Sequence, residues 1–296
     1  MRIVAGFNEV PPVEVIVPHQ QSVPFVFNSP HSGKCYPKSF VAASRLDSHA
    51  IRRSEDAFVD YLFEDVVSHG APLIRANFPR AFLDVNREPY ELDPKMFNGR
   101  LPSYANTRSL RVAGGLGTIA RVVGESQEIY RNRLDVSDGL HRIEKLYKPF
   151  HQTIRRTLAR THVTFGHAIL IDCHSMPSTV RGHDIRTRPD FILGDRYGTS
   201  CMPTLTRVAE EFLAERGYSV SRNKPYAGGF ITEHYGRPAR GLHAMQIEIN
   251  RGLYMDEVEI CLSENASQLK TDLTELSRHL LTLPDYIFST ESIAAE

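Results

Sequence analysis

Four short polar segments of this chain carry histidine, carboxylate or guanidinium side chains. His31 lies in the first segment and His174 in the third, each directly after an apolar run. Imidazole nitrogens are common ligands of zinc, whereas a single histidine is more often only hydrogen-bonded. Two histidines in equivalent positions therefore indicate a metal site. The four segments are residues 28–33, 54–56, 171–175 and 246–251.

A carboxylate would complete the two-histidine, one-carboxylate set of many catalytic zinc sites, which leaves one position open for water. Glu55 and Asp56 are the candidates, and spacing alone does not decide between them. Both also have a structural interpretation, because acidic residues in the first turn of a helix stabilise its dipole and Ser54 is a suitable N-cap. Asp172, two residues before His174, is a candidate to orient that imidazole.

Glu248 lies within an otherwise apolar stretch, where an unpaired carboxylate would be costly to bury. Two explanations are open. Glu248 forms a salt bridge with Arg251 or another arginine, or it acts as a general base whose pKa is set by its surroundings.

Several arginines follow apolar segments in the same way, and they suggest an anionic ligand. Arg75 and Arg80 follow one predicted strand, and Arg87, preceded by Asn86, and Arg251 each lie in a short polar turn directly after an apolar segment. A guanidinium group presents a planar fork of donors that suits carboxylates. Arginines near a metal site therefore predict a small-molecule substrate that carries carboxylate groups.

The elements that must position these residues alternate between strand and helix patterns. Apolar runs at 24–28, 71–76, 168–172 and 244–249 predict buried strands, and 3.6-residue apolar spacing predicts helices at 54–67, 137–159, 202–216 and about 256–281. Residues 93–124 are rich in Gly, Pro, Asn and Ser and are predicted as a loop over the site. The pattern predicts an α/β fold, residues 1–296 forming one domain with a mostly parallel sheet between helices. The polar segments then meet at the carboxyl ends of the strands.

Composition narrows the range of partners. Lys+Arg and Asp+Glu both total 35, so the zero formal charge predicts no general attraction to nucleic acid or membranes. The sequence shows no secretory signal and no apolar run long enough for a membrane span, which predicts a cytoplasmic location. The four cysteines are far apart in the sequence and are expected to be reduced and mostly buried.

Taken together, five motifs of the chain resemble those of the N-formylglutamate amidohydrolases over about residues 25–280. The motifs occur in the same order with fitting gaps, which makes the set more specific than any one of them. They are Pro30-His31-Ser32-Gly33; Ser54-Glu55-Asp56-Ala57-Phe58-Val59-Asp60; Asp84-Val85-Asn86-Arg87; Asp172-Cys173-His174-Ser175-Met176-Pro177; and Glu248-Ile249-Asn250-Arg251-Gly252-Leu253-Tyr254.

The resemblance implies a fold similar to that of zinc carboxypeptidases, of the phosphorylase/hydrolase-like type. It implies Zn²⁺ as cofactor, hydrolysis of N-formyl-L-glutamate to L-glutamate and formate, and a place in histidine degradation. Its motifs imply His31, Asp56 and His174 as metal ligands, with Asp56 preferred to Glu55. Glu248 would be the general base. Asn86, Arg87, Arg251 and Arg80 would bind the substrate carboxylates.

Other readings remain open. The chain has Ala57-Phe58 where the members best matched to histidine breakdown carry an aromatic and a further polar residue, so a deacylase or small-peptide carboxypeptidase with another N-acyl substrate is the nearest alternative. A metal-free hydrolase with Ser32 or Ser175 as nucleophile is disfavoured, since neither serine lies in a GxSxG motif. A protein that kept the fold and lost the chemistry is the non-catalytic alternative.

Overall fold

The computed structural model describes residues 1–179, 188–283 and 285–288. Backbone contacts group the chain into two compact units, each assembled from three separate segments. Unit 1 comprises residues 1–14, 30–55 and 75–154, and unit 2 comprises residues 15–29, 56–74 and 155–296. Because both units are discontinuous in sequence, neither corresponds to a simple half of the chain. The single-domain organisation stays a prediction.

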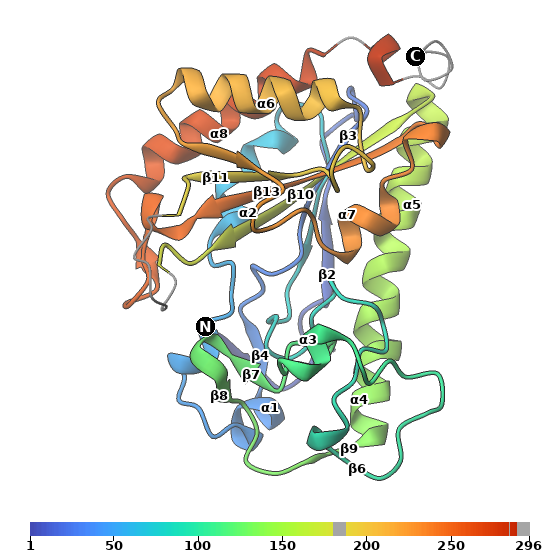
Figure 1. Cartoon of the computed structure of the whole chain (residues 1–296), viewed down its shortest axis with the longest axis vertical. Helices are drawn as coiled ribbons and strands as arrows, with labels where there is room; N and C mark the ends of the chain where they lie inside the picture. The colour runs from blue at the N-terminus through green and yellow to red at the C-terminus, as the bar shows by residue number, and fades with distance from the viewer. Residues whose placement is uncertain (180–187, 284, 289–296) are drawn as a thin grey trace. The chain divides into compact units, whose positions relative to one another are not determined.

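A seven-stranded sheet runs through the fold (Figure 1). Strand β10 pairs in parallel with β13 and β3, and β11 pairs in parallel with β12 but antiparallel with β13. The predicted mixed, mostly parallel sheet is therefore confirmed. In spatial order the strands are β12 (Val220–Arg222), β11 (Phe191–Gly194), β13 (Leu242–Asn250), β10 (Ala168–Met176), β3 (Phe25–Ser29), β5 (Leu73–Ala76) and β2 (Val13–Ile16).

The central strands have two different faces because successive side chains of a strand point to opposite sides. In β13, Ile247 and Ile249 belong to the main apolar core, while Gln246 and Glu248 alternate with them. In β10 the same alternation separates Ile171 and Cys173, which lie in the core, from Asp172 and His174. The register pairs Asp172 with Gln246 and His174 with Glu248, so the polar side chains share one face.

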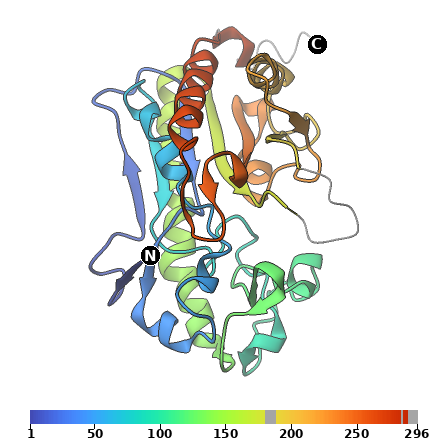
Figure 2. The ribbon, with the colours of Figure 1, turned by 90° about the vertical axis from the view of Figure 1, so that its left-hand side faces the viewer.

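Three helices of unit 2 also contribute to that core: α2 (Val59–Leu62), α6 (Pro203–Glu215) and α8 (Ala266–Leu281). Their apolar stripes cover the face that carries Ile171 and Ile247. Figure 2 shows α8, in red, running alongside the strands of this unit. A short helix, α7 (Phe230–Tyr235), contacts β10 and β13.

A long helical stretch is formed by α4 (Val136–Arg142), one π-helical segment (Ile143–Tyr147) and α5 (Lys148–Phe165). It confirms the helix predicted at 137–159. The remaining strands and helices are short: β1 (Arg2–Val4), β4 (Cys35–Pro37), α1 (Lys38–Ala43), β6 (Phe97–Asn98), α3 (Leu110–Ala113), β7 (Val122–Val123), β8 (Gln127–Glu128), β9 (Leu134–Asp135), β14 (Met255–Asp256) and β15 (Cys261–Leu262).

The predicted helix at 54–67 is wrong in its first half. Residues 54–58 form turns and irregular backbone, and helix α2 begins only at Val59. Phe58 has a φ of +66°, a left-handed conformation that a right-handed helix cannot contain. Ser54 is therefore not an N-cap, and Glu55 and Asp56 do not lie in the first turn of a helix.

The last predicted helix, at about 256–281, begins later than expected. Residues 255–262 form a small hairpin of β14 and β15, and α8 starts at Ala266. Asp256 Oδ1 accepts hydrogen bonds from the backbone N–H groups of Val258 and Glu259, which closes a turn. This local side-chain bond competes with helix formation at that point.

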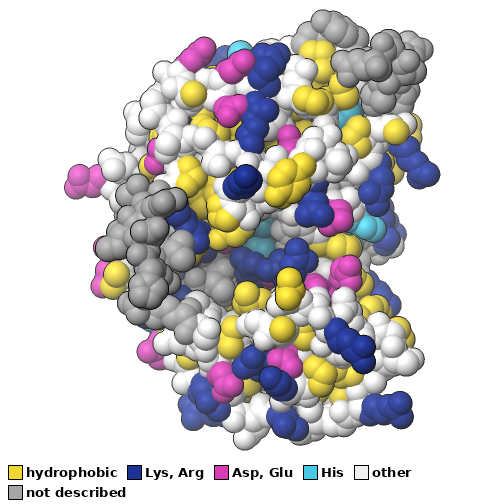
Figure 3. Space-filling view, viewed as in Figure 1, with side chains coloured by type: hydrophobic (Ala, Val, Ile, Leu, Met, Phe, Trp, Pro, Cys, Tyr) yellow, Lys and Arg dark blue, Asp and Glu magenta, His cyan; other side chains and the backbone are white. Residues whose placement is uncertain are grey.

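On the face drawn in Figure 3, Lys and Arg side chains lie among Asp and Glu side chains, in keeping with the zero formal charge.

Among the described residues, none of the helices has both the length and the apolar character that a membrane crossing requires.

Candidate metal centre

His174 lies near the end of β10 and is almost fully buried, 2% exposed. Its Nε2 atom is 2.9 Å from Asp172 Oδ2, which is the orienting contact expected from the sequence. Asp172 is held in turn by Asn28, whose side-chain amide donates to Asp172 Oδ1 at 2.7 Å. The imidazole orientation is thus fixed by a carboxylate that is itself fixed by the neighbouring strand β3.

Asp56 lies on the other side of the same imidazole. His174 Nδ1 is 2.9 Å from Asp56 Oδ2, and Arg251 donates through Nη2 to Asp56 Oδ1 at 3.1 Å. Arg251 also donates from Nε to the hydroxyl of Ser175 at 3.2 Å. These contacts explain why the backbone before α2 is not helical, since they hold Asp56 beside the ends of β10 and β13.

The two carboxylates change the acid–base behaviour of His174. Burial by itself lowers the pKa of the imidazole, but the charge of Asp172 and hydrogen bonds to Asp172 and Asp56 oppose it. With a further contribution from Glu248, the pKa of His174 is raised well above its usual value. The ring between two carboxylates therefore favours a positive charge at this position, either its own proton or a bound cation.

His31 follows β3 directly and is 1% exposed. Its Nε2 atom is 2.8 Å from Asp84 Oδ1. Asp84 also accepts from Arg80 Nε at 3.0 Å and lies 3.5 Å from Arg87 Nη2. Burial alone would raise the pKa of Asp84, yet Arg87, Arg80 and His31 together hold that pKa well below the usual range. Asp84 is therefore a permanent anion at neutral pH.

The side chains of His31, Asp56 and His174 form a buried group that could hold a metal ion. One potential ligand atom from each residue lies within 4.8 Å of the others. In both histidines Nε2 faces a carboxylate, Asp84 or Asp172, which leaves Nδ1 as the nitrogen suited to coordination. Metal-binding histidines usually donate their second N–H to a carboxylate in this way. The donor set fits a divalent ion.

Glu55, the alternative carboxylate, belongs to a different network. It accepts a hydrogen bond from the hydroxyl of Tyr36 at 2.5 Å and bonds from Arg52 Nε and Nη2 at 3.0–3.1 Å. Arg52 and Tyr36 thus satisfy this buried carboxylate within unit 1. The metal group contains Asp56 and not Glu55.

Glu248 lies on β13 opposite His174 and is 8% exposed. The side-chain amide of Gln246 donates from Nε2 to Glu248 Oε1 at 2.8 Å. Arg251, which sequence reasoning offered as a salt-bridge partner for Glu248, forms an ion pair with Asp56. Glu248 therefore lies on the strand next to the metal group, on the same face of the sheet as His174.

The predicted carboxylate-binding residues Asn86 and Arg87 lie in the turn after Asp84. Arg87 donates from Nε to the carbonyl of Leu116 at 3.0 Å and from Nη1 to the carbonyl of Asn86 at 2.8 Å. The backbone N–H of Asn86 donates to Asp84 Oδ1 at 2.8 Å. Asp84 thus organises this turn as well as the His31 imidazole.

Sequence reasoning missed the contacts of Asp84 and of Gln246. Asp84 was visible as the first residue of the motif that ends in Arg87, but no sequence signal connects it with His31, which lies 53 residues earlier. For Gln246 a signal was available, because it alternates with Glu248 on a strand and must share its face.

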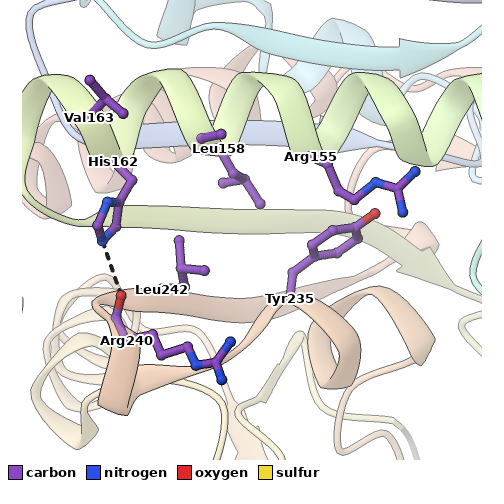
Figure 4. Close-up of a pocket in the computed structure, with 8 residues that line it drawn as sticks. Arg155, Leu158, His162, Val163, Tyr235, Arg240 and Leu242 are labelled. Atoms are coloured by element: carbon purple, nitrogen blue, oxygen red, sulfur yellow. Dashed lines mark hydrogen bonds between the residues drawn. The ribbon is translucent and has the colours of Figure 1, made fainter.

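A groove of about 390 Å³ lies elsewhere in unit 2, between α5 and the start of β13 (Figure 4). Leu158, Tyr235 and Leu242 line it, and His162 Nε2 is 3.1 Å from the carbonyl of Arg240 at its edge. Leu242 and Glu248 are six positions apart on β13, a distance of roughly 20 Å at the usual rise of a strand. None of the predicted site residues lines this groove.

The chain is similar to known proteins in both sequence and fold. Residues 23–255 match the family model described as N-formylglutamate amidohydrolase. The chain is similar to two curated N-formylglutamate deformylases. It is 30% identical to that of Pseudomonas putida over 244 residues (81% of this chain, 85% of the relative) and 29% identical to that of Pseudomonas aeruginosa over 271 residues (90% and 93%). It also resembles the crystal structure of N-formylglutamate amidohydrolase from Ralstonia eutropha, with a TM-score of 0.87, 34% identity and coverage of 94% of this chain and 99% of that one.

Proposed function

Because the chain belongs to the N-formylglutamate amidohydrolase family, we propose that it hydrolyses N-formyl-L-glutamate to L-glutamate and formate with the help of a bound zinc ion. The observation that carries this proposal is the buried group of His31, Asp56 and His174, in which each imidazole is oriented by a carboxylate. Two histidines and one carboxylate are a typical ligand set of zinc hydrolases.

In this proposal His31, Asp56 and His174 hold the ion. When bound, such an ion lowers the pKa of a water molecule and polarises the carbonyl oxygen of the scissile amide. A metal site of this kind needs a base close by that accepts the proton of the attacking water.

Glu248 is that base. It accepts the proton of the water that attacks the formyl carbon and passes it to the amide nitrogen as the carbon–nitrogen bond breaks. Its position opposite His174 and its hydrogen bond from Gln246 support this role. Glu248 lies next to His174 in the register of two central strands, and a side chain on such an element is held more precisely than one on a loop.

The substrate carboxylates are bound by Arg251, Arg87, Arg80 and Asn86. The guanidinium groups of Arg251 and Arg87 are already held by hydrogen bonds to fixed acceptors, so little side-chain entropy is lost when substrate binds. Arg80 is anchored to Asp84 through Nε, and its side chain is 26% exposed.

The proposal is tested by measuring metal content and then hydrolysis of a substrate panel. Purified protein is analysed for metals, stripped with chelator and reloaded with Zn²⁺. Release of formate, acetate or succinate is then measured with N-formyl, N-acetyl and N-succinyl derivatives of glutamate, and with N-formyl derivatives of neutral amino acids. We expect activity that depends on metal and is highest with N-formyl-L-glutamate.

Other outcomes would change the proposal in defined ways. Full activity of the stripped protein would remove the metal from the reaction. A preference for another acyl group would identify a different N-acyl amino acid deacylase. Equal kcat/KM for acidic and neutral N-formyl amino acids would mean that the arginines do not recognise the side-chain carboxylate.

A further inference from the structure

We propose that Gln246 is a positioning residue that holds the Glu248 carboxylate in its catalytic orientation and couples it to the glycine-rich turn before α7. This inference rests on the proposed role of Glu248 as general base. Both residues lie on β13, two positions apart, and both are buried.

The orientation of the Gln246 amide is set by its oxygen. Oε1 accepts the backbone N–H of Gly229 at 2.7 Å and a longer bond from the Thr232 hydroxyl at 3.4 Å. With the oxygen directed at two donors, the amide nitrogen must point the other way, and Nε2 donates to Glu248 Oε1 at 2.8 Å. A hydrogen bond to a carboxylate is among the stronger ones in proteins, so it restricts where the second oxygen of Glu248 points.

The turn that supplies the Gly229 N–H can approach β13 only because glycines lie on both sides of the contact. Gly194 is the residue of β11 opposite Gln246, and a Cβ atom there would lie 2.6 Å from the backbone nitrogen of Gly228. Gly228 has a φ of +110°, which other residues rarely adopt. A hydrogen bond from Arg196 N–H to the carbonyl of Ala227, 2.8 Å long, holds the turn in place.

These contacts form one continuous path from the 227–229 turn through Gln246 to Glu248. Apolar packing alone would not require it, since a leucine has nearly the volume of glutamine and would bury without hydrogen bonds. The amide is instead used on both sides, once as acceptor and once as donor. The donor function toward Glu248 is the one that matters for catalysis.

Two variants of Gln246 separate the two functions. Gln246→Leu removes both hydrogen bonds. Gln246→Glu keeps an acceptor for Gly229 but replaces the amide donor by a second carboxylate beside Glu248, which repels the Glu248 carboxylate or shares a proton with it. We expect both to lower kcat on N-formyl-L-glutamate by about 10- to 100-fold, the usual loss when a supporting hydrogen bond of a site is removed. KM should change less than about twofold, and metal content should match the wild type.

The 227–229 turn can also be monitored by a measurement that does not depend on catalysis. Hydrogen–deuterium exchange of the peptide that contains Gly229 should accelerate in Gln246→Leu and stay near the wild-type rate in Gln246→Glu. Thr232→Val removes only the longer bond and Gln152→Leu changes an exposed glutamine of α5, so both controls should keep kcat within about twofold of wild type.

A double-mutant cycle with Glu248→Gln decides whether Gln246 acts through Glu248. If it does, Gln246→Leu causes no further loss of kcat once Glu248 has been replaced. An unchanged kcat in Gln246→Leu, or a full further loss in the Glu248→Gln background, would overturn the proposal. Absence of hydrolysis by the wild-type protein across the substrate panel would instead reject the proposed function itself, and with it this role.

Discussion

Each histidine of the metal group has its Nε2 atom beside a carboxylate, Asp84 for His31 and Asp172 for His174. Such carboxylates fix the ring orientation and make the opposite nitrogen a better ligand. Asp84 has a second task, since it also holds Arg80 and the turn of Asn86 and Arg87. One anion thus organises a proposed metal ligand and three proposed substrate-binding residues.

Replacing Asp84 should therefore weaken metal binding without removing a ligand. We expect Asp84→Asn to lower zinc affinity by about 10- to 100-fold. The dissociation constant is measured by competition with a chromogenic chelator, and Asp138→Asn, at an exposed position of α4, is the matched control. Zinc affinity equal to wild type in the correctly folded variant would show that His31 does not depend on Asp84.

Glu248→Gln tests the general base. The amide keeps the size of the side chain but cannot accept the proton of water, so kcat should fall at least about 100-fold while zinc content stays the same. Metal analysis and formate release are measured on the same preparation, with the exposed Glu259→Gln as control. A near-normal kcat would assign the base to another residue.

The two histidines of the metal group could be named from the sequence because each lies at or just after the end of a strand, and the carboxyl ends of parallel strands meet in space. Asp56 was expected in the first turn of a helix that the structure does not contain. The choice between Glu55 and Asp56 could not be made that way. It depends on Tyr36 and Arg52, which bind Glu55, and on the placement of Asp56 beside His174. Such contacts between residues distant in the sequence leave no trace in local spacing.

At the level of elements, four strands of the main sheet, β3, β5, β10 and β13, were predicted because their apolar runs are bounded by turns and polar residues, whereas β2, β11 and β12 were not predicted. β10 proved longer than predicted, since its last residues include the polar side chain of His174. β13 extends beyond the predicted run by two residues at its start and one at its end. The helix at 54–67 failed because Asp56 is held by His174 and Arg251, and because Phe58 adopts a left-handed conformation. Tertiary contacts here override a valid helical pattern.

β13 is anchored near its other end by His243. Its Nδ1 accepts the backbone N–H of Met202 at 3.3 Å, and its Nε2 donates to the carbonyl of Phe288 at 3.1 Å. This arrangement requires a neutral ring. Burial, only partly opposed by the hydrogen bond to Phe288, lowers the pKa of His243 to about 4.

The depressed pKa gives a defined pH dependence of stability. The unfolded chain binds a proton at His243 below about pH 6.5, whereas the folded chain does so only near pH 4, so stability is lost as the pH falls between these values. The loss is at most about 1.4 kcal/mol per pH unit. Urea unfolding at pH 7 and pH 5 should show a smaller loss for His243→Gln than for wild type or for the exposed control His141→Gln. Identical losses in all three would contradict this account.

For the whole molecule, the metal group joins residues that are 25 and 118 positions apart along the chain, from His31 to Asp56 and from Asp56 to His174. An unfolded chain cannot keep three such ligands together. A metal that binds only the folded chain stabilises it by mass action.

Zinc should therefore raise the free energy of unfolding by about 2.7 kcal/mol at a free concentration 100 times its dissociation constant. The measurement is a thermal or urea denaturation of stripped protein with and without Zn²⁺. His174→Ala should abolish the increase, since it removes a ligand. An equal increase in wild type and His174→Ala would place the bound metal at another site.

Cys173 and His174 are neighbours in sequence, yet their side chains lie on opposite faces of β10, and the thiol is buried in the apolar core. Burial raises the pKa of Cys173 well above its usual value, and Cys35 and Cys201 are buried as well. Cys261, at the hairpin before α8, is exposed. A maleimide dye should thus attach once per folded chain and four times after denaturation. Cys261 therefore offers a specific point of attachment for a fluorophore, far along the chain from the metal group.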